Sequence, residues 1–327
     1  MGAVLSRARR RRRHRRRRRR ASTDRRRLVI LVAGGTGRLG TEVVHRLVSR
    51  GVAVRVLTRD LARATHVAGP LVEVVHADVR DALSLEPVME GITTVVSAVH
   101  GFAGPGGVTP ASVDRDGNAN LVGAASAAHA SVVLLSIVGA SPQHPMELIQ
   151  MKAAAEANLR GSTTGWTIVR ATAFVELWLE LITGSAGRSG RPLIFGRGDN
   201  PINFVSVDDV AAVVEMAVVD PTLRGQVLEV GGPQNLTLND LAALAQQRPG
   251  SSDKAPRHLP RPVLRAVAAS GRVAGSVIAR QAAMALVMDT TDMTFDAEPL
   301  HATHPHLPFT TVSGCSPGGR TAPRTTQ

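Results

Sequence analysis

Three glycines at a fixed spacing constrain the fold of this chain more than any other feature. Gly34, Gly37 and Gly40 are three residues apart and follow directly on the apolar run Leu28–Val32. A short apolar run of this kind is typical of a strand that is buried on both faces. After the glycines, apolar residues recur at every fourth position, as on one face of a helix: Leu39, Val43 and Leu47. The segment therefore predicts a buried strand, a tight glycine turn and an amphipathic helix.

The alternation of strand and helix continues along the chain. Further apolar runs predict strands over residues 52–57, 71–76, 93–99, 131–136 and 166–170. Helices are predicted between them, notably over residues 121–130 and 146–159. Such alternation is typical of an α/β fold built on a doubly wound parallel sheet of the Rossmann type, with right-handed crossovers.

The pattern becomes less regular beyond residue 172. Ser206 and Asp209 have the spacing of a capping box, and they predict the start of a helix. The proline-rich stretch Pro249–Pro262 is predicted to be a linker or an exposed loop. The remaining predicted elements are strands over 203–205 and 226–230, and helices over 236–245 and 263–288.

These patterns predict four segments in the chain. The nucleotide-binding Rossmann domain is expected over residues 28–172. A small C-terminal substrate region, interleaved with that core, is expected over residues 173–310. Residues 1–27 are predicted to be a disordered leader, and residues 311–327 a disordered tail.

The net charge of the chain comes from its first residues. Of the 39 basic side chains, 15 arginines lie in residues 1–27 together with a single acid, Asp24. The other 300 residues hold 24 basic and 25 acidic side chains, so the folded part is nearly neutral. A neutral body argues against a nucleic-acid-binding surface on the fold itself. Binding of nucleic acid through the arginine-rich leader is left open, and the alternative is a leader without function.

The cysteine count and the hydropathy point to a cytoplasmic protein. Cys315 is the only cysteine, so no disulfide forms within one chain, which is typical of a reducing compartment. No apolar run approaches the roughly 20 residues that a membrane-spanning helix needs. We therefore predict no membrane span and a cytoplasmic location.

The glycine turn has the chemistry of a dinucleotide site. Gly34 permits the tight turn, Gly37 lets the backbone approach a pyrophosphate, and Gly40 lets the helix pack on the strand. The phosphates would lie at the helix N-terminus, where free N–H groups and the helix dipole favour negative charge. The alternative is a purely structural glycine turn. The predicted cofactor contacts in this loop are Gly34, Thr36, Gly37, Arg38, Leu39 and Gly40.

The end of the second strand should contact the ribose of the adenosine. Arg59 stands there, and an arginine pairs with the 2′-phosphate of NADP(H), with Arg38 as a second cation. The alternative is that Asp60 binds the ribose of NAD(H) and Arg59 is solvated. NADP(H) is therefore the preferred cofactor, and NAD(H) is possible. Asp78, after the third strand, is a candidate for the adenine amino group, unless it caps the helix that starts near Asp81.

Several motifs in this order resemble the NmrA-like and isoflavone-reductase-like branch of the atypical short-chain dehydrogenase/reductase superfamily. The resemblance covers about residues 28–245. The matching segments are Val32-Ala33-Gly34-Gly35-Thr36-Gly37-Arg38-Leu39-Gly40, Thr58-Arg59, His76-Ala77-Asp78, Ser136-Ile137-Val138-Gly139-Ala140, Lys152 with Glu156, Trp166-Thr167-Ile168-Val169-Arg170 and Val207-Asp208-Asp209-Val210-Ala211.

The resemblance implies a catalytic serine, tyrosine and lysine, and one of the three is absent here. Ser136 and Lys152 stand at the expected positions, but Leu148 occupies the tyrosine position and the chain has no tyrosine. Leucine transfers no proton, so the usual mechanism is excluded.

Two hypotheses follow from this departure. In the first, the chain is an NADPH-dependent oxidoreductase with a small organic acceptor, and either Lys152 is the acid–base group or a quinone-like acceptor takes its proton from water. In the second, the chain binds NADP(H) without turnover and regulates protein partners. The plain structural alternative makes Ser136 a strand-end hydroxyl and pairs Lys152 with Glu156 one helical turn later.

The remaining candidate residues have a structural and a functional interpretation each. His100 follows the fourth strand and is either a proton donor or an ordinary loop histidine. Phe174 and Trp178 either line a substrate pocket or pack in a helix core. His144 lies in a turn without a partner at ligand spacing, and His301, His304 and His306 alternate with prolines, as in an extended loop. We predict no metal site.

Overall fold

A parallel sheet dominates the computed structural model, which describes residues 29–102, 104, 106–247, 254–270 and 277–315. Within these residues the sheet has seven strands, in the order β10-β6-β5-β4-β1-β2-β3. The doubly wound parallel sheet predicted from the sequence is confirmed. Its strands are β1 (Val29–Ala33), β2 (Ala53–Thr58), β3 (Val72–His76), β4 (Thr94–Ser97), β5 (Ser131–Ile137), β6 (Trp166–Ala171) and β10 (Gln226–Val230).

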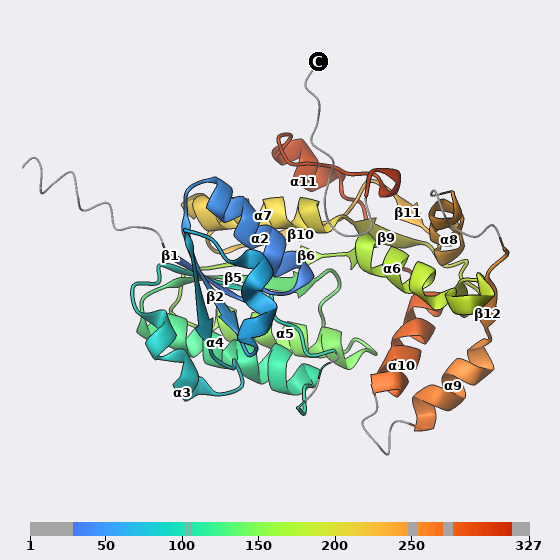
Figure 1. Cartoon of the computed structure of the whole chain (residues 1–327), viewed down its shortest axis with the longest axis horizontal. Helices are drawn as coiled ribbons and strands as arrows, with labels where there is room; N and C mark the ends of the chain where they lie inside the picture. Colours follow the sequence, from blue (N-terminus) through green and yellow to red (C-terminus); the bar gives the residue numbers. More distant parts are fainter. Residues whose placement is uncertain (1–28, 103, 105, 248–253, 271–276, 316–327) are drawn as a thin grey trace, which may run out of the picture.

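Helices cover both faces of the sheet (Figure 1). One face carries α2 (Arg38–Ser49) and α7 (Val207–Val219), and the other carries α3 (Ala82–Leu85), α4 (Asp116–Ala127) and α5 (Glu147–Arg160). Successive side chains of a strand point to opposite faces, so Ile30 packs toward α2 whereas Leu31 packs toward α4. The short apolar run that opens the fold is therefore buried on both sides.

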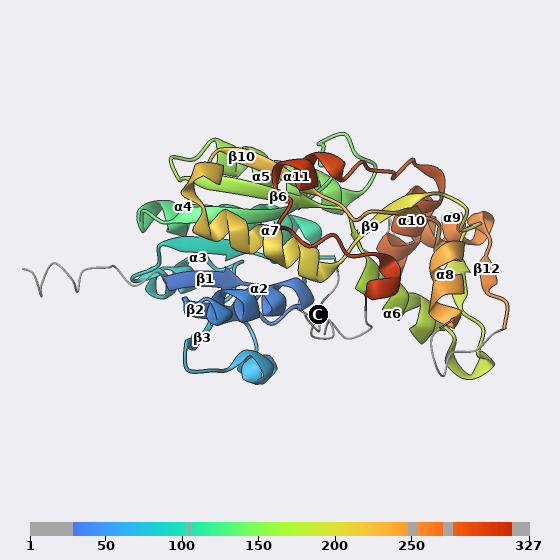
Figure 2. The ribbon, with the colours of Figure 1, turned by 90° about the horizontal axis from the view of Figure 1, so that it is seen from above.

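A second lobe lies beside the carboxyl ends of the sheet strands (Figures 1 and 2). Phe204, Leu179 and Leu241 belong to its own hydrophobic core. After β9 the chain leaves this lobe to form α7, on one face of the main sheet, and β10, at the edge of that sheet. It returns to the lobe at β11. The elements of the lobe are α6 (Val175–Ser185), α8 (Leu238–Gln246), α9 (Arg261–Ser270), α10 (Val277–Thr290), β7 (Ala173–Phe174), β8 (Leu193–Phe195), β9 (Ile202–Val205), β11 (Asn235–Leu236) and β12 (Arg257–Leu259).

The remaining elements are short, and one of them, a helical turn, matters for the site. The segment Ala111–Arg115, labelled η3, is a π-helical turn that leads directly into α4. The others are α11 (Glu298–Thr303), η1 (Leu61–Val67), η2 (Pro87–Met89), η4 (Gly187–Ser189), η5 (Pro221–Leu223) and η6 (Val312–Gly314).

Three predictions for the C-terminal half differ from the structure. The predicted helix over 263–288 is two helices, α9 and α10, packed as a hairpin, and residues 271–276 between them lie outside the described residues. The stretch Pro249–Pro262 is not all loop, because β12 pairs in parallel with β8. Residues 311–315, expected in a disordered tail, include η6, and Val312 and Cys315 are buried in the lobe's core.

The predicted capping box at the start of α7 is wrong. Ser206 is the N-cap and accepts a hydrogen bond from the Asp208 N–H at 3.2 Å. Asp209 does not reach back to the cap residue, because its carboxylate accepts hydrogen bonds from the backbone N–H and the hydroxyl of Thr310, at 2.8 and 2.7 Å. A contact far along the chain thus replaces the local one.

The predicted leader, residues 1–27, lies outside the described residues. Across the part of the chain that is described, no helix has both the length and the apolar character to cross a membrane.

Candidate functional site

The glycine loop joins β1 to α2 in the geometry that its sequence predicts. Gly34 has a φ of +84°, in the left-handed region that favours glycine. A Cβ atom there would lie 2.7 Å from the carbonyl oxygen of Ala98, the residue that follows β4. Gly37 is the N-cap of α2, and because it has no side chain it makes no capping hydrogen bond to the helix end. The first N–H groups of α2 therefore have no side-chain cap, which leaves them for a ligand.

The other two glycines of the motif have different roles in the packing. A Cβ atom on Gly40 would lie 2.1 Å from the carbonyl oxygen of Gly34, so α2 packs directly on the turn. A Cβ atom on Gly37 would meet only that same oxygen, at 3.3 Å. Leu39 is 5% exposed and anchors α2 in the core, so it offers a ligand only its backbone. Thr36 is half-buried on the same turn.

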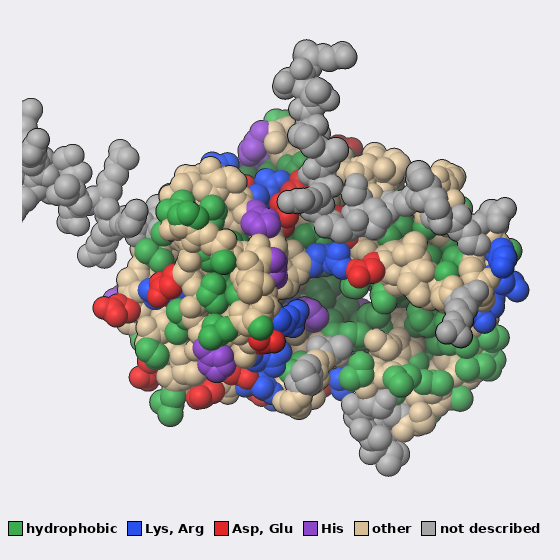
Figure 3. All heavy atoms as spheres, in the orientation of Figure 1, with side chains coloured by type: hydrophobic (Ala, Val, Ile, Leu, Met, Phe, Trp, Pro, Cys, Tyr) green, Lys and Arg blue, Asp and Glu red, His purple; other side chains and the backbone are tan. Residues whose placement is uncertain are grey.

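Arg38 connects the glycine loop to the second lobe. Its guanidinium forms an ion pair with the Glu180 carboxylate on α6. Figure 3 shows a hollow between the sheet-containing part and the second lobe, with hydrophobic side chains on its walls. Arg38, predicted as a second cation for a ribose phosphate, is thus paired across the two parts of the molecule.

Cationic side chains gather where the adenosine ribose is expected. Arg59 is exposed directly after β2, and the neighbouring Asp60 accepts a hydrogen bond from the Ala62 N–H at 3.0 Å as the N-cap of η1. Asp78 accepts hydrogen bonds from the Arg80 guanidinium, at distances down to 2.6 Å. The hydrogen bonds from Arg80 lower the pKa of Asp78, and the Arg59 charge acts in the same direction.

Two points about this end of the site correct or extend the sequence analysis. Asp81 caps α3, accepting from the Leu83 N–H at 3.1 Å, so the capping alternative for Asp78 is wrong. Arg80 was not among the predicted site residues. The sequence signal that could have indicated Arg80 is its position two residues after Asp78, in the loop that follows β3.

Lys152 is buried in an ion pair at the carboxyl end of the sheet. Its ammonium lies 3.0 Å from the Asp114 carboxylate, and the two side chains are 3% and 0% exposed. The same ammonium donates to the carbonyl oxygens of Val99 and Leu135, at 3.0 and 3.1 Å. Asp114 was missed by sequence reasoning, because it reaches Lys152 from the π-helical turn η3, which has no sequence signature.

Ser136 belongs to a separate buried network. Its hydroxyl donates to the Glu156 carboxylate at 2.5 Å. Glu156 also pairs with Arg170 at 2.7 Å and with Arg160 at 3.1 Å. Burial tends to raise the pKa of Glu156, but the hydrogen bonds from Arg170 and Ser136 outweigh it and the pKa is lowered. The structural alternative that paired Lys152 with Glu156 is therefore wrong.

The other candidates differ in burial and in what they pack against. Leu148, at the tyrosine position, is half-buried on α5. Trp178 is 6% exposed and packs in the core of the second lobe, and Phe174 packs against the main core. His100 is exposed just after β4. Its pKa is lowered, because nearby protein atoms reduce the hydration of the ring and the Lys152 charge lies near it, while Asp114 acts in the opposite direction.

The other candidate histidines make contacts within the protein. His144 accepts from the Met146 N–H at 3.0 Å, and His301 stacks on Phe309 with ring centroids 3.7 Å apart. His304 and His306 make an edge-to-face contact. Among the residues that the structure describes, no group of three or more His, Cys, Asp or Glu side chains is arranged to hold a metal ion.

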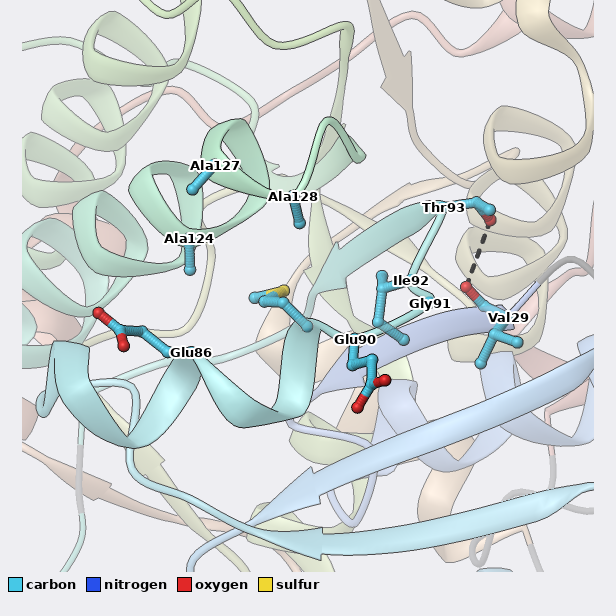
Figure 4. Close-up of a pocket in the computed structure, with 10 residues that line it drawn as sticks. Val29, Glu86, Glu90, Gly91, Ile92, Thr93, Ala124, Ala127 and Ala128 are labelled. Carbon is cyan, nitrogen blue, oxygen red and sulfur yellow. Dashed lines mark hydrogen bonds between the residues drawn. The ribbon is translucent and has the colours of Figure 1, made fainter.

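A cavity of about 830 Å³ lies at the opposite edge of the sheet (Figure 4). Val29 and Thr93, at the amino ends of β1 and β4, line it together with Met89 and Ala124. Ligands of doubly wound sheets bind at the carboxyl ends of the strands. This cavity is therefore not the dinucleotide site.

The comparisons with known proteins agree with the glycine-loop geometry. The family model described as NAD(P)H-binding matches residues 34–221, more than half of the chain. The chain belongs to the NAD(P)H-binding family. The cofactor class predicted from the glycine loop is thereby confirmed.

Individual relatives extend this result. The chain is 27% identical over 214 residues to an NAD(P)H azoreductase of Xenophilus azovorans, which covers 65% of this chain and 71% of the relative. It is 24% identical over 225 residues to the photosystem II assembly factor Ycf39 of Trieres chinensis, with 68% and 70% covered.

A solved structure shares the fold. The NADPH-dependent quinone oxidoreductase QOR2 of Escherichia coli, in complex with NADPH, superposes with a TM-score of 0.69 at 22% identity, covering 87% of this chain and 97% of that one. The NAD(P)H-binding family implied by the sequence resemblance is confirmed by the family model, and this structure shows the same fold.

Proposed function

We propose that this chain is an NADPH-dependent oxidoreductase that passes hydride to a small organic acceptor such as a quinone or an enone. One observation carries the proposal. The uncapped start of α2 lies at the point where the strand order reverses, between β1 and β4, and Gly34 touches the chain that leaves β4. Dinucleotides bind at such switch points, with the pyrophosphate at the helix N-terminus.

The described residues fit NADPH better than NADH. The backbone N–H groups from Thr36 to Leu39 would hold the pyrophosphate, and the exposed Arg59 would pair with the 2′-phosphate, because the Arg80 guanidinium is bonded to Asp78 and to the Gly106 carbonyl oxygen. Asp60, the alternative ribose contact, accepts the Ala62 N–H with one carboxylate oxygen as the cap of η1, and Arg59 is the cation beside it. The bound cofactor supplies hydride, and the chain holds both reactants at the carboxyl edge of the sheet while the walls of the hollow exclude water.

The catalytic roles of Ser136 and Lys152 stay predictions. Both side chains are buried and hydrogen-bonded within the protein. Proton transfer by Lys152 requires its ammonium to leave Asp114 and two carbonyl oxygens. The proposed reaction does not depend on that step when the acceptor takes its proton from water.

A second candidate is a non-catalytic NADP(H)-sensing regulator that acts through protein partners. It is favoured by Leu148 at the tyrosine position and by the relative that is an assembly factor. The oxidoreductase and the regulator differ in whether bound NADPH is consumed. The cytoplasmic location of the chain also stays a prediction.

Turnover decides between the two candidates. Purified full-length chain is mixed with NADPH and a panel of quinones, enones and azo compounds, and NADPH loss is followed by absorbance. Acceptor-dependent oxidation that saturates with acceptor supports the oxidoreductase. Tight NADPH binding without oxidation by any member of the panel contradicts it and favours the regulator.

A further inference from the structure

The buried Lys152–Asp114 pair fixes the backbone on both sides of His100. The Lys152 ammonium binds the carbonyl oxygen of Val99 at 3.0 Å, and the Asp114 carboxylate accepts from the Gly101 N–H at 2.7 Å. The two charged groups are themselves 3.0 Å apart. A closed ring of contacts therefore runs from Val99 through the ion pair to Gly101, with His100 between its ends.

The chain on the far side of His100 is equally constrained. A Cβ atom on Gly101 would lie 2.1 Å from the carbonyl oxygen of Thr109, so only glycine permits this approach. Gly101 is buried, whereas the His100 side chain is exposed. A buried ion pair is costly unless its geometry is well matched. One hydrogen bond from each member of this pair goes to the backbone next to His100, and the Lys152 ammonium also donates to the Leu135 carbonyl oxygen.

His100 lies next to the glycine loop. Gly34 leaves no room for a Cβ atom beside the Ala98 carbonyl, two residues before His100. His100 thus follows the carboxyl end of β4, beside the turn that leaves β1, at the switch point where the proposed function places both reactants. Leu148, at the tyrosine position, has no polar group to offer the acceptor.

The surroundings of His100 lower the pKa of its ring, which favours the neutral imidazole. Protein atoms around the exposed ring reduce its hydration, and the charge of Lys152 on α5 acts in the same direction, against the opposing charge of Asp114 on η3. Arg280 on α10 reaches the same loop, with its guanidinium 3.4 Å from the Phe102 carbonyl oxygen. A neutral imidazole carries one N–H donor, which is suited to a carbonyl oxygen on which negative charge develops.

We propose that His100 contacts the acceptor and donates a hydrogen bond to its carbonyl oxygen as hydride arrives, with Lys152 and Asp114 as its positioning residues. The inference rests on the proposed function. NADPH supplies the hydride, with both electrons, and leaves as NADP⁺. The hydride forms a new bond to the acceptor, the electron pair of the acceptor's π bond moves to oxygen, and His100 stabilises that oxyanion until water protonates it.

Substitution of His100 separates this role from cofactor binding. We expect His100→Leu to lower kcat/KM for the acceptor about 100-fold, as for loss of one oxyanion donor. His100→Asn, which restores an N–H donor, should recover part of that loss. NADPH affinity measured by calorimetry should be unchanged in both variants. His306→Gln, at an exposed histidine of the C-terminal region, is the matched control and should retain full turnover.

A second readout does not depend on activity. In the unliganded protein, the NMR titration of the His100 ring, assigned by its absence in His100→Asn, should give a pKa below 6.5, and Lys152→Met should raise it. Wild-type turnover that His100→Leu leaves unchanged overturns the role of His100 alone. Absence of turnover in the wild type overturns the proposed function, and this role with it. A His100 titration unaffected by Lys152→Met refutes the positioning by the ion pair.

Discussion

Removing one partner of the buried ion pair should destabilise the fold more than removing both charges. In Lys152→Met the apolar stem remains, but the fully buried Asp114 carboxylate keeps only the Gly101 N–H at 2.7 Å. An uncompensated buried charge of this kind costs about 3–5 kcal/mol. In Asp114→Asn the Gly101 bond is retained and Lys152 keeps two carbonyl acceptors, so we expect a loss of roughly 1–3 kcal/mol.

The double variant decides whether this reasoning is correct. It contains no buried charge at the pair, so it should be more stable than Lys152→Met. This requires a coupling free energy larger than the loss measured for Asp114→Asn, and so about 1–3 kcal/mol or more. Urea unfolding followed by circular dichroism gives the free energy of unfolding of all four proteins. If the two single losses add, so that the double variant is the least stable of the four, the pair is not coupled and our account of it is refuted.

Three further predictions concern the loop, the ribose contact and the Ser136 network. Gly40→Ala should lower the free energy of unfolding by about 1–3 kcal/mol in urea titrations, because its Cβ would lie 2.1 Å from the Gly34 carbonyl oxygen; wild-type stability would contradict this. Arg59→Ala should weaken NADPH binding about 10-fold in calorimetry and leave NADH binding unchanged, since only NADPH carries the 2′-phosphate; an equal loss for both would disprove the contact. Glu156→Gln should cost roughly 1–3 kcal/mol at pH 7, because it removes the carboxylate that pairs with Arg170. The folded-state pKa of Glu156 is lowered, so its contribution to the free energy of unfolding is present above pH 4.5 and is lost as the pH falls through the folded-state pKa. If the difference in the free energy of unfolding between wild type and Glu156→Gln does not narrow in acid, this reasoning is refuted.

The sequence predicted those parts of the fold that depend on short-range patterns. The apolar run before Gly34 and the four-residue repeat after it determine β1, the turn and α2, because burial on both faces and helical periodicity are visible in neighbouring residues. The need for glycine at positions 34 and 40 is visible in the same way, since a positive φ and a close backbone approach both demand glycine. The structure differs in one detail, because Gly40 approaches the turn at Gly34 rather than the strand.

Contacts between distant segments could not be predicted in this way. The carboxylate of Asp209 binds Thr310 about a hundred residues away, so a local capping rule was wrong there. Lys152 was expected near Glu156 by helical spacing, yet it pairs with Asp114 from the π-helical turn. The role inferred for His100 depends on that tertiary contact, which the sequence around His100 does not show.

The measurement that tests the central claim most directly is a calorimetric titration of NADPH and NADH into the full chain and into Gly37→Ala. The variant should fold, because a Cβ at Gly37 meets only the Gly34 carbonyl oxygen at 3.3 Å, but its methyl group would occupy the space beside the uncapped helix start. We predict that the wild type binds NADPH at least about 10-fold more tightly than NADH, about 1.4 kcal/mol, and that Gly37→Ala loses most of the affinity for both. Equal binding of the two cofactors, or NADPH binding that Gly37→Ala does not weaken, would contradict the account.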